Sequence, residues 1–165
     1  MRALALLALL PLSGCIYSFT GGGLPSHIRT VAVLPFENNT TQPLLQTDIQ
    51  QALQKALPGS LGVRIADQSV ADAVVRGTVT RFEEAAASVR PTAPGESQIP
   101  VVQRQIQISY DAEIYDLRED HPIWQGKGQS VVGNYQPESE EAAAGIARAI
   151  QQLVSKVIEG AQSQW

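Results

Sequence analysis

The chain has 165 residues, with 12 lysine and arginine side chains against 16 aspartate and glutamate side chains, a formal net charge of −4 at pH 7. This mildly acidic balance argues against non-specific binding to nucleic acid, which needs a basic surface. The single cysteine excludes a disulfide bond within the chain, so a folded domain has to rely on core packing.

The first 15 residues carry an export signal with a cysteine at its end. Met1-Arg2 gives a positive start, the run 3–12 has no charged side chain, and Leu12-Ser13-Gly14-Cys15 follows. This order is typical of a secretory signal peptide, and the run is too short to span a bilayer, which takes about 20 residues. The cysteine resembles the lipobox of bacterial lipoproteins, which implies cleavage before Cys15 and acylation of that residue.

We expect three segments along the chain. Residues 1–14 form the cleaved lipoprotein signal peptide, residues 15–29 form the acylated N-terminus and tether, and residues 30–165 form a single domain. Because no second apolar run reaches membrane-spanning length, the acyl chains on Cys15 are the membrane attachment we expect. Stable membrane anchoring takes more than one acyl chain, and several acyl chains on one cysteine meet this requirement.

The start of the domain predicts a strand followed by a helix. Thr30–Phe36 is nearly all apolar and rich in β-branched side chains, which is typical of a buried strand. After a polar loop, apolar residues recur at three- and four-residue steps between Leu44 and Leu57, so one face of a helix is apolar. We expect this helix to end at Pro58-Gly59.

Two further strands and a loop are expected next. A short strand covers about residues 62–66. Residues 72–85 begin with period-two alternation, as in a half-buried strand, and the alternation breaks at Arg81-Phe82, where we expect a bulge or bend. Residues 86–100 contain three prolines and a glycine and are expected to form a loop.

The clearest alternation in the chain lies in residues 101–117, which predict a long antiparallel strand with one wet face. A charged turn at 118–122 and a return strand at 123–135 complete a hairpin. The face expected to be buried carries five residues: Ile106, Ile108, Tyr110, Ala112 and Ile114.

The chain closes with a predicted helix that runs to about Gln162. Glu138, Glu140 and Glu141 are expected in its first turn, where the helix dipole favours acids. Its apolar stripe consists of Ile146, Ile150, Leu153, Val154, Val157, Ile158 and Ala161.

Together these elements predict a two-layer α+β domain, because two helices with one-sided apolar stripes can cover only one face of a sheet. We expect a mixed, mostly antiparallel sheet of about four strands with both helices packed on one face. The first two strands are joined through a helix and are expected to be parallel neighbours. The remaining pairs are expected to be antiparallel.

The sequence shows no constellation of residues for catalysis or metal binding. His27 and His121 lie far apart, and neither has a cysteine or a second histidine at metal-ligand spacing. The carboxylate pairs are adjacent in sequence, and neighbours in a strand point to opposite faces. We therefore expect no enzyme activity, no cofactor and no metal ion.

The wet face of the long strand is the candidate binding surface. Arg76 and Lys127 are expected near it on adjoining strands, and these two cations and Arg104 are candidate contacts for a partner or for phosphorylated sugars. Plain solvation is the alternative for each residue. The polar strip assigned to this face consists of Gln103, Arg104, Gln105, Gln107 and Ser109.

Several segments in order resemble the LptE family of lipopolysaccharide-assembly lipoproteins. They are Cys15–Gly21 directly after the lipobox, Leu24–Val33, Phe36–Thr40 and Ala71–Val79, followed by the long alternating strand and a closing helix that ends in tryptophan. The resemblance covers essentially the whole mature chain. It implies a fold of two helices on a four-stranded sheet, in agreement with the expectation above.

The resemblance also implies a function. Members of the family are lipoproteins of the outer membrane, on its periplasmic side, that plug and support the LptD β-barrel, and the pair inserts lipopolysaccharide into the outer leaflet. The implied partners are LptD, lipopolysaccharide and, through the acyl chains, the membrane. Ile16 is not the aspartate that retains lipoproteins in the inner membrane of enteric bacteria, which fits the outer membrane.

Val31–Asn38 also resembles the first strand of other periplasmic lipoproteins, among them the penicillin-binding-protein activator LpoB and the curli secretion lipoprotein CsgG. Only 14 residues separate Cys15 from the first predicted strand, which argues against the long tether of the activator. The candidate membrane-inserting hairpin of a pore former is Val101–Tyr135, and its charged and amide residues suit a polar surface better than lipid.

Overall fold

The computed structural model describes residues 23–89 and 101–163. The expected signal peptide (residues 1–14), Cys15 and the C-terminal Trp165 lie outside the described residues. Within them, the elements in chain order are β1 (Thr30–Val33), β2 (Glu37–Asn38), α1 (Leu45–Leu61), β3 (Arg64–Ile65), β4 (Ala73–Val89), β5 (Val101–Asp116), β6 (His121–Tyr135) and α2 (Ala142–Gln162).

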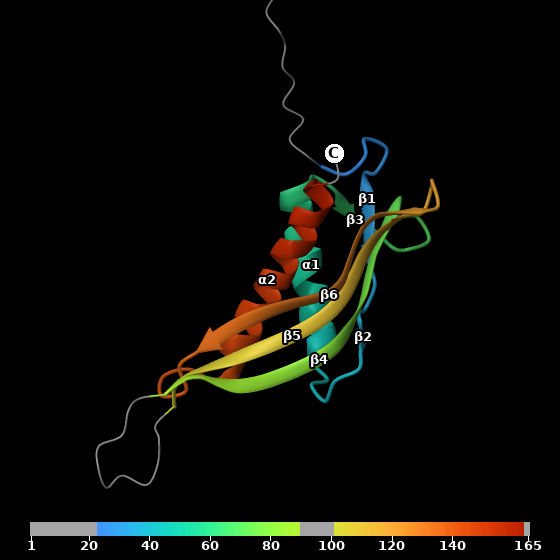
Figure 1. The fold of residues 1–165 in the computed structure, drawn as a ribbon. Coiled ribbons are helices and arrows are strands. Elements are labelled where there is room, and N and C mark those ends of the chain that lie inside the picture. The colour runs from blue at the N-terminus through green and yellow to red at the C-terminus, as the bar shows by residue number, and fades with distance from the viewer. Residues whose placement is uncertain (1–22, 90–100, 164–165) are drawn as a thin grey trace, which may run out of the picture.

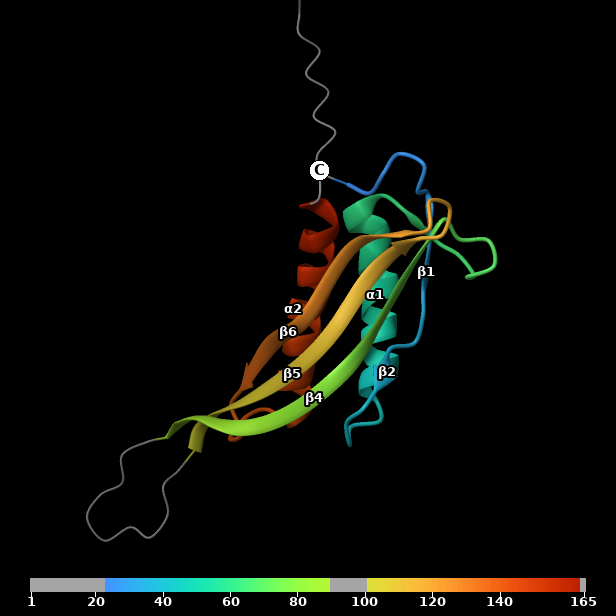
Figure 2. The ribbon, with the colours of Figure 1, turned by 45° about the vertical axis from the view of Figure 1, so that its right-hand side comes forward.

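Both helices pack on one face of a single sheet, as Figures 1 and 2 show. The strand order is β3-β1-β4-β5-β6, and β2 pairs with β4 beyond the end of β1. This arrangement confirms the predicted two-layer α+β fold. The described sheet has six strands rather than about four: the expected short strand near residues 62–66 is β3, and the two-residue segment β2, in the stretch expected to be a polar loop, joins the sheet as well.

β1 runs parallel to both of its neighbours. Its pairing with β3 confirms the expected parallel pair, but the pairs β1–β4 and β2–β4 are parallel as well. The expectation that all remaining pairs are antiparallel was therefore wrong. The reason is the loop after β3, which brings the chain back beside the start of β1, where the N–H of Asp72 donates to the carbonyl oxygen of Thr30 (3.0 Å). The long pairs β4–β5 and β5–β6 are antiparallel, as expected.

β4 and β5 form a longer hairpin than the sequence predicts. β4 continues to Val89 and pairs there with the start of β5, which corrects the loop expected at residues 86–89. The rest of that expected loop, residues 90–100, lies outside the described residues. Pairing across the hairpin keeps this segment extended although its own sequence does not alternate. The predicted bulge is confirmed, because Val79 and Arg81 lie opposite consecutive residues of β5 and Thr80 is the extra residue.

α1 ends later than its sequence indicates. The helix includes Pro58 and runs to Leu61, and it ends at Gly62, which has a left-handed φ of 68° and donates its N–H to the carbonyl oxygen of Pro58 (3.1 Å). The end expected at Pro58-Gly59 was wrong. Pro58 lacks only its own N–H, and its carbonyl still accepts the capping bond, while Leu57 before it is fully buried and Leu61 after it packs against the core.

α2 begins later than expected. Its first residue is Ala142, so Glu138, Glu140 and Glu141 precede the helix and are not in its first turn. Glu141 is the N-cap residue in extended conformation. Glu140 instead reaches the side chain of Arg148 inside the helix (Oε1 to Nη2, 2.5 Å), so this acid is stabilised by a cation rather than by the helix dipole alone.

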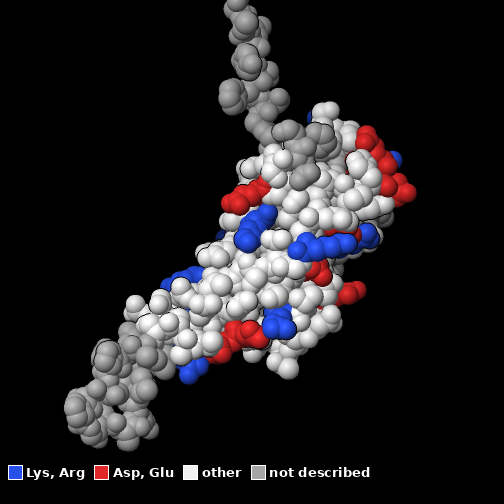
Figure 3. All heavy atoms as spheres, viewed as in Figure 1, with Lys and Arg blue, Asp and Glu red and all other residues white. Residues whose placement is uncertain are grey.

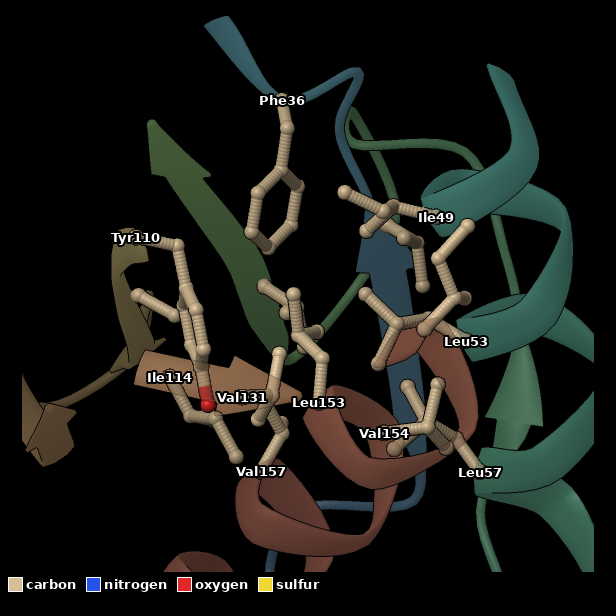
Figure 4. Close-up of a cluster of buried hydrophobic side chains, with 14 of the residues drawn as sticks. Phe36, Ile49, Leu53, Leu57, Tyr110, Ile114, Val131, Leu153, Val154 and Val157 are labelled. Atoms are coloured by element: carbon tan, nitrogen blue, oxygen red, sulfur yellow. The ribbon is translucent and has the colours of Figure 1, made fainter. Parts of the chain in front are cut away.

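The core lies between the sheet and the two helices. All five residues predicted on the inner face of β5 are buried, which confirms the assignment of its two faces. Figure 4 shows Tyr110 of β5, Phe36 after β1, Leu53 of α1 and Leu153 of α2 directed into one cluster. Each of these four side chains is fully buried, so both helices are held on the sheet by a continuous apolar layer.

Candidate functional site on the open face of the sheet

The face of the sheet turned away from the helices is polar, and we call it the open face. No described element covers it (Figure 2). The β5 residues that alternate with the buried ones point to this face, and they are half-buried. One of them, Gln107, donates from Nε2 to Ser130 Oγ of β6 (3.0 Å). The alternating set on β5 is Gln103, Gln105, Gln107 and Ser109.

A groove of about 400 Å³ lies on the open face. It brings Arg76 of β4 and Lys127 of β6 into one lining, although the two residues come from strands on either side of β5. Two of the three cations proposed from the sequence are therefore brought together. The groove is not purely basic, since its lining also contains Glu37, Asp111 and Glu113.

A β-bulge in β6 sets the position of Lys127. Lys127 and Gly128 together lie opposite the single residue Asp111 of β5. Gly128 has a φ of 61°, a left-handed conformation that glycine adopts without steric cost, and its N–H donates to Asp111 Oδ1 (2.6 Å). Bulges commonly re-aim a side chain, so the Gly-Lys-Gly sequence here places a lysine within the groove.

Arg76 is held in place by its cross-strand neighbours. Its Nε donates to Glu113 Oε1, and its guanidinium carbon lies 5.0 Å from the centre of the Tyr115 ring, a cation–π contact. Glu113 also accepts a bond from Gln125 Nε2 (2.9 Å). Burial alone raises the pKa of Glu113, but the bonds from Arg76 and Gln125 outweigh it and keep the pKa below its ordinary value. The groove therefore holds an ionised, oriented ion pair.

Arg104 does not belong to the open face, which corrects its assignment to the polar strip. Arg104 is two residues before Ile106, so both side chains point to the same face of β5, and Arg104 pairs with Tyr135 of β6. Its Nη1 donates to Glu84 Oε1 (2.7 Å), which also accepts the Tyr135 hydroxyl (2.6 Å). The bonds from Tyr135 and Arg104 lower the pKa of Glu84. The alternation of β5 alone would have placed Arg104 on the helix side.

α2 seals part of the exposed edge of β6. The Arg148 Nη1 donates to the carbonyl oxygen of Asn134 (2.6 Å), and the Lys156 Nζ donates to that of Ser130 (3.3 Å). Between them, the N–H of Val132 donates to Gln152 Oε1 (3.3 Å). The unpaired N–H and C=O groups of an uncovered edge strand can pair with a strand of another chain. Because three helix side chains occupy these backbone groups, a partner strand is disfavoured over this stretch and the open face remains the accessible surface.

Two buried aspartates bond to the segment before β1, which belongs to the tether expected at residues 15–29. Asp72 Oδ2 accepts the N–H groups of Arg29 and Thr30 (both 2.9 Å). Asp116 Oδ2 lies 2.5 Å from His27 Nε2. Residues 27–29 are thus bonded to the domain. Each aspartate lies at the end of a strand, where backbone N–H groups without a partner in the sheet need an acceptor. An aspartate at a predicted strand end was the only sequence signal for these contacts.

The described open face carries hydrogen-bonding and charged groups that can contact a polar surface. It offers amide and hydroxyl groups together with charged side chains of both signs, as the lining of the groove illustrates. Among the helices described, none is long and apolar enough to cross a membrane.

Comparisons with known proteins identify a family and a fold. The family model LptE, described as lipopolysaccharide-assembly, matches residues 28–159. The fold is similar to a PelC dodecamer structure from Paraburkholderia phytofirmans, with a TM-score of 0.52 and 18% identity over 87% of this chain and 96% of that chain. It is similar to the hypothetical protein CT253 from Chlamydia trachomatis, with a TM-score of 0.54 and 14% identity over 81% of this chain and 98% of that chain.

The protein XCC0632 from Xanthomonas campestris is also similar, with a TM-score of 0.52 and 12% identity over 86% of this chain and 91% of that chain. At such identities the similarity to solved structures shows the fold alone. No curated protein sequence matches the chain.

Proposed function

The chain belongs to the LptE family of lipopolysaccharide-assembly proteins, and from this membership we propose that it is an outer-membrane lipoprotein that plugs and supports the LptD β-barrel. In this proposal acyl chains on Cys15 anchor the protein at the periplasmic face of the outer membrane. The pair then transports lipopolysaccharide and inserts it into the outer leaflet. The family match covers residues 28–159 and so includes both layers of the fold, which supports the proposal.

The observation that carries the proposal beyond the family match is the open polar face. The interior of a large transmembrane β-barrel is polar, so a plug needs a surface of amides, hydroxyls and charges of both signs. The open face has this composition in Gln107, Ser130 and the Arg76–Glu113 pair. We propose that it lies against the inner wall of the barrel.

Arg76 and Lys127 are the cations that we assign to contact with the barrel or with lipopolysaccharide phosphates. Both line the groove, and the bulge at Gly128 places the lysine there. Arg104 is left out of this surface, because it is bonded to Glu84 on the helix side of the sheet. We propose a binding role without catalysis, which agrees with the hydrogen-bonding and charged groups of the described open face.

The first test is a pull-down of the tagged full chain from detergent-solubilised outer membranes, with mass spectrometry of the partners. A stoichiometric large β-barrel protein is the expected result. Recovery of a cell-wall synthase, or of copies of the chain alone, contradicts the proposal in favour of the activator or the secretion class.

The second test maps the contact face with a photo-crosslinking amino acid. Introduced at Gln107 on the open face, the probe is expected to crosslink to the barrel. Ser155, which is exposed on α2, is the matched control on the opposite layer. Equal or stronger crosslinking from Ser155 would place the barrel wall against the helices and overturn the assignment of the open face.

A further inference from the structure

Three of the four large apolar side chains that the described residues expose lie at the end of the domain where the described chain begins. They are Ile65 at the end of β3, Val70 in the loop after β3 and Leu117 in the turn between β5 and β6, with exposed fractions of 37%, 69% and 40%. Figures 1 and 2 show this loop and this turn beside each other at that end, and the N–H of Leu117 donates to the carbonyl oxygen of Asp72 (2.9 Å). Apolar residues scattered singly on a surface are common, whereas an exposed apolar patch marks an interaction site.

Hydrogen bonds hold Val70 and Leu117 at tight turns. The N–H of Val70 donates to the carbonyl oxygen of Asp67 (3.0 Å), and Asp116 Oδ1 accepts the N–H groups of the two residues that follow Leu117 (2.7 and 3.0 Å). Turns usually carry polar residues, glycine or proline. Neither Val70 nor Leu117 is among the residues that form the core or pack partly buried against it, so core packing does not account for an apolar side chain at either turn.

The segment before β1, which leads back to the proposed lipid anchor, is bonded beside both turns. Asp72 and Asp116, which bond to this segment, flank the exposed side chains. Asp72 follows Val70 by two residues, and Asp116 directly precedes Leu117. The chain that leads back to Cys15 therefore meets the domain at the same place as the apolar turns.

The length of the chain between Cys15 and the domain keeps this end close to the anchor. Residues 16–22 separate Cys15 from Gly23, the first described residue. Because an extended chain covers at most about 3.6 Å per residue, Cys15 lies within about 30 Å of Gly23. α2 has 21 residues, is about 32 Å long and runs toward this end of the domain (Figure 1). The end with the apolar turns is therefore the one that the anchor holds nearest to a bilayer.

The charges at this end favour a surface of neutral lipid. Figure 3 shows acidic side chains gathered where Figure 1 draws the turn between β5 and β6, and this turn contains Glu119 and Asp120. The exposed cation of the same turn, Arg118, is paired with Asp72 Oδ1 (2.5 Å). Anionic lipids attract basic segments, so they would repel this turn, whereas zwitterionic headgroups leave its apolar side chain free to enter the bilayer.

We propose that this end of the domain contacts the membrane, with Val70 and Leu117 entering the headgroup region of a bilayer rich in zwitterionic lipid. Two side chains alone bind a membrane weakly, since the strength of binding follows the apolar area buried. The acyl chains on Cys15 make the contact intramolecular, so a weak interaction is enough to populate it. The inference rests on the acylation in the proposed function and not on the identity of the barrel. In this contact the long strands lead away from the bilayer surface and leave the open face clear of lipid.

The test uses the protein purified from membranes with its acyl chains and reconstituted into vesicles of phosphatidylcholine and phosphatidylethanolamine. Val70→Cys and Leu117→Cys each introduce one free thiol for an environment-sensitive fluorophore, because acylation occupies the sulfur of Cys15. Leu44→Cys is the matched control, since Leu44 is 70% exposed and precedes α1 at the other end of the domain (Figure 1). The labels at Val70 and Leu117 are expected to shift their emission to the blue and to be quenched by spin-labelled lipid at least about threefold more than the label at Leu44.

Three outcomes would overturn the membrane contact. Labels at Val70 and Leu117 that stay as solvent-exposed as the label at Leu44, on protein that floats with the vesicles, would refute the contact and leave the anchoring intact. A protein that does not float with the vesicles would contradict the acylation in the proposed function, on which the contact rests. Labels that are shielded only when a β-barrel protein is added would assign both residues to that partner instead of to lipid.

The lipid composition tests the charge argument. Replacing part of the phosphatidylcholine by phosphatidylglycerol is expected to reduce the quenching of the label at Leu117, because Glu119 and Asp120 then face like charge. Stronger quenching on anionic vesicles would contradict the assignment to neutral lipid.

Discussion

Gly133 of β6 and Gly145 of α2 meet backbone to backbone. A Cβ atom added to Gly133 would fall far inside contact distance of the Gly145 carbonyl oxygen, and it would lie 2.7 Å from the backbone nitrogen of Ala149. A Cβ on Gly145 would lie 2.8 Å from Tyr135 Cδ1. The two glycines therefore allow the helix to lie directly on the strand, in the stretch where α2 also bonds to the edge of β6.

Gly133→Ala is expected to destabilise the domain by about 3 kcal/mol, because backbone atoms of α2 cannot move aside without lifting the helix from the sheet. Chemical denaturation followed by circular dichroism measures the loss. Gly59→Ala is the matched control: it lies in α1 with nothing within 4 Å of the added Cβ, and it is expected to be neutral or slightly stabilising. Equal stability of the Gly133→Ala variant and the wild type would contradict the close approach.

Tyr110→Phe is expected to stabilise the protein by about 1 kcal/mol. The Tyr110 hydroxyl is buried without a hydrogen-bond partner, and burial raises the pKa of this phenol to about 12. Removing a buried, unsatisfied polar group relieves its desolvation cost. Tyr135→Phe is the comparison, since it loses the bond to Glu84, and it is expected to lower the denaturation midpoint.

Ile108→Asp is expected to unfold the domain, because it places an unpaired charge in the core at a cost of about 4 kcal/mol or more. Ile108 is fully buried on the helix side of β5. Gln105→Asp makes the same kind of change on the open face, opposite Ala85 and Asn134, and should leave the melting temperature nearly unchanged. A folded Ile108→Asp variant would show that the two faces of β5 are assigned the wrong way round.

The elements with a strong local period were predictable from the sequence. β5 alternates over its whole inner face, from Ile106 to Ile114, and each predicted residue is buried. The apolar stripe of α2 was predictable for the same reason, because a helix that covers a sheet needs one continuous apolar face. The break in the alternation near Arg81 likewise indicated the bulge at Thr80.

The features that depend on contacts between distant segments were not predictable. The parallel pairing of β1 with β4 follows from where the loop after β3 returns, and no local pattern records that path. The end of α1 beyond Pro58 depends on packing of Leu61 against the core. The contact of His27 with Asp116 requires both the segment before β1 and the end of β5 to be placed first.

Cys15→Ser is expected to abolish acylation and to release the protein from the membrane fraction. The thioether-linked lipid of the proposal would need the sulfur of this residue, which is the one cysteine of the chain. Metabolic labelling with palmitate measures the modification. A variant that still incorporates the label would refute the lipobox assignment, and Ser18→Ala, a change shortly after the cleavage position, provides a control that should still be labelled.

Asp72→Asn is expected to lower stability at pH 7 by about 2 kcal/mol. The N–H of Arg29 makes the largest contribution to lowering the Asp72 pKa far below its ordinary value; burial opposes it, and Thr30 and Arg118 add to the lowering. Replacement by an amide keeps the shape but removes the charge that these donors stabilise. Asp48→Asn, on the exposed side of α1, is the control and should change stability little.

The pH dependence of the stability difference between wild type and Asp72→Asn shows whether the charge of Asp72 causes that difference. Because the pKa of Asp72 is lower in the folded than in the unfolded chain, its contribution is fully present above the unfolded value of about 3.9 and is lost as the pH falls toward the folded value. The stability gap between wild type and Asp72→Asn should therefore be constant between pH 5 and 7 and shrink between pH 4 and 2, as measured by urea denaturation at each pH. A gap that stays constant down to pH 2 would mean that Asp72 acts through packing and not through its charge.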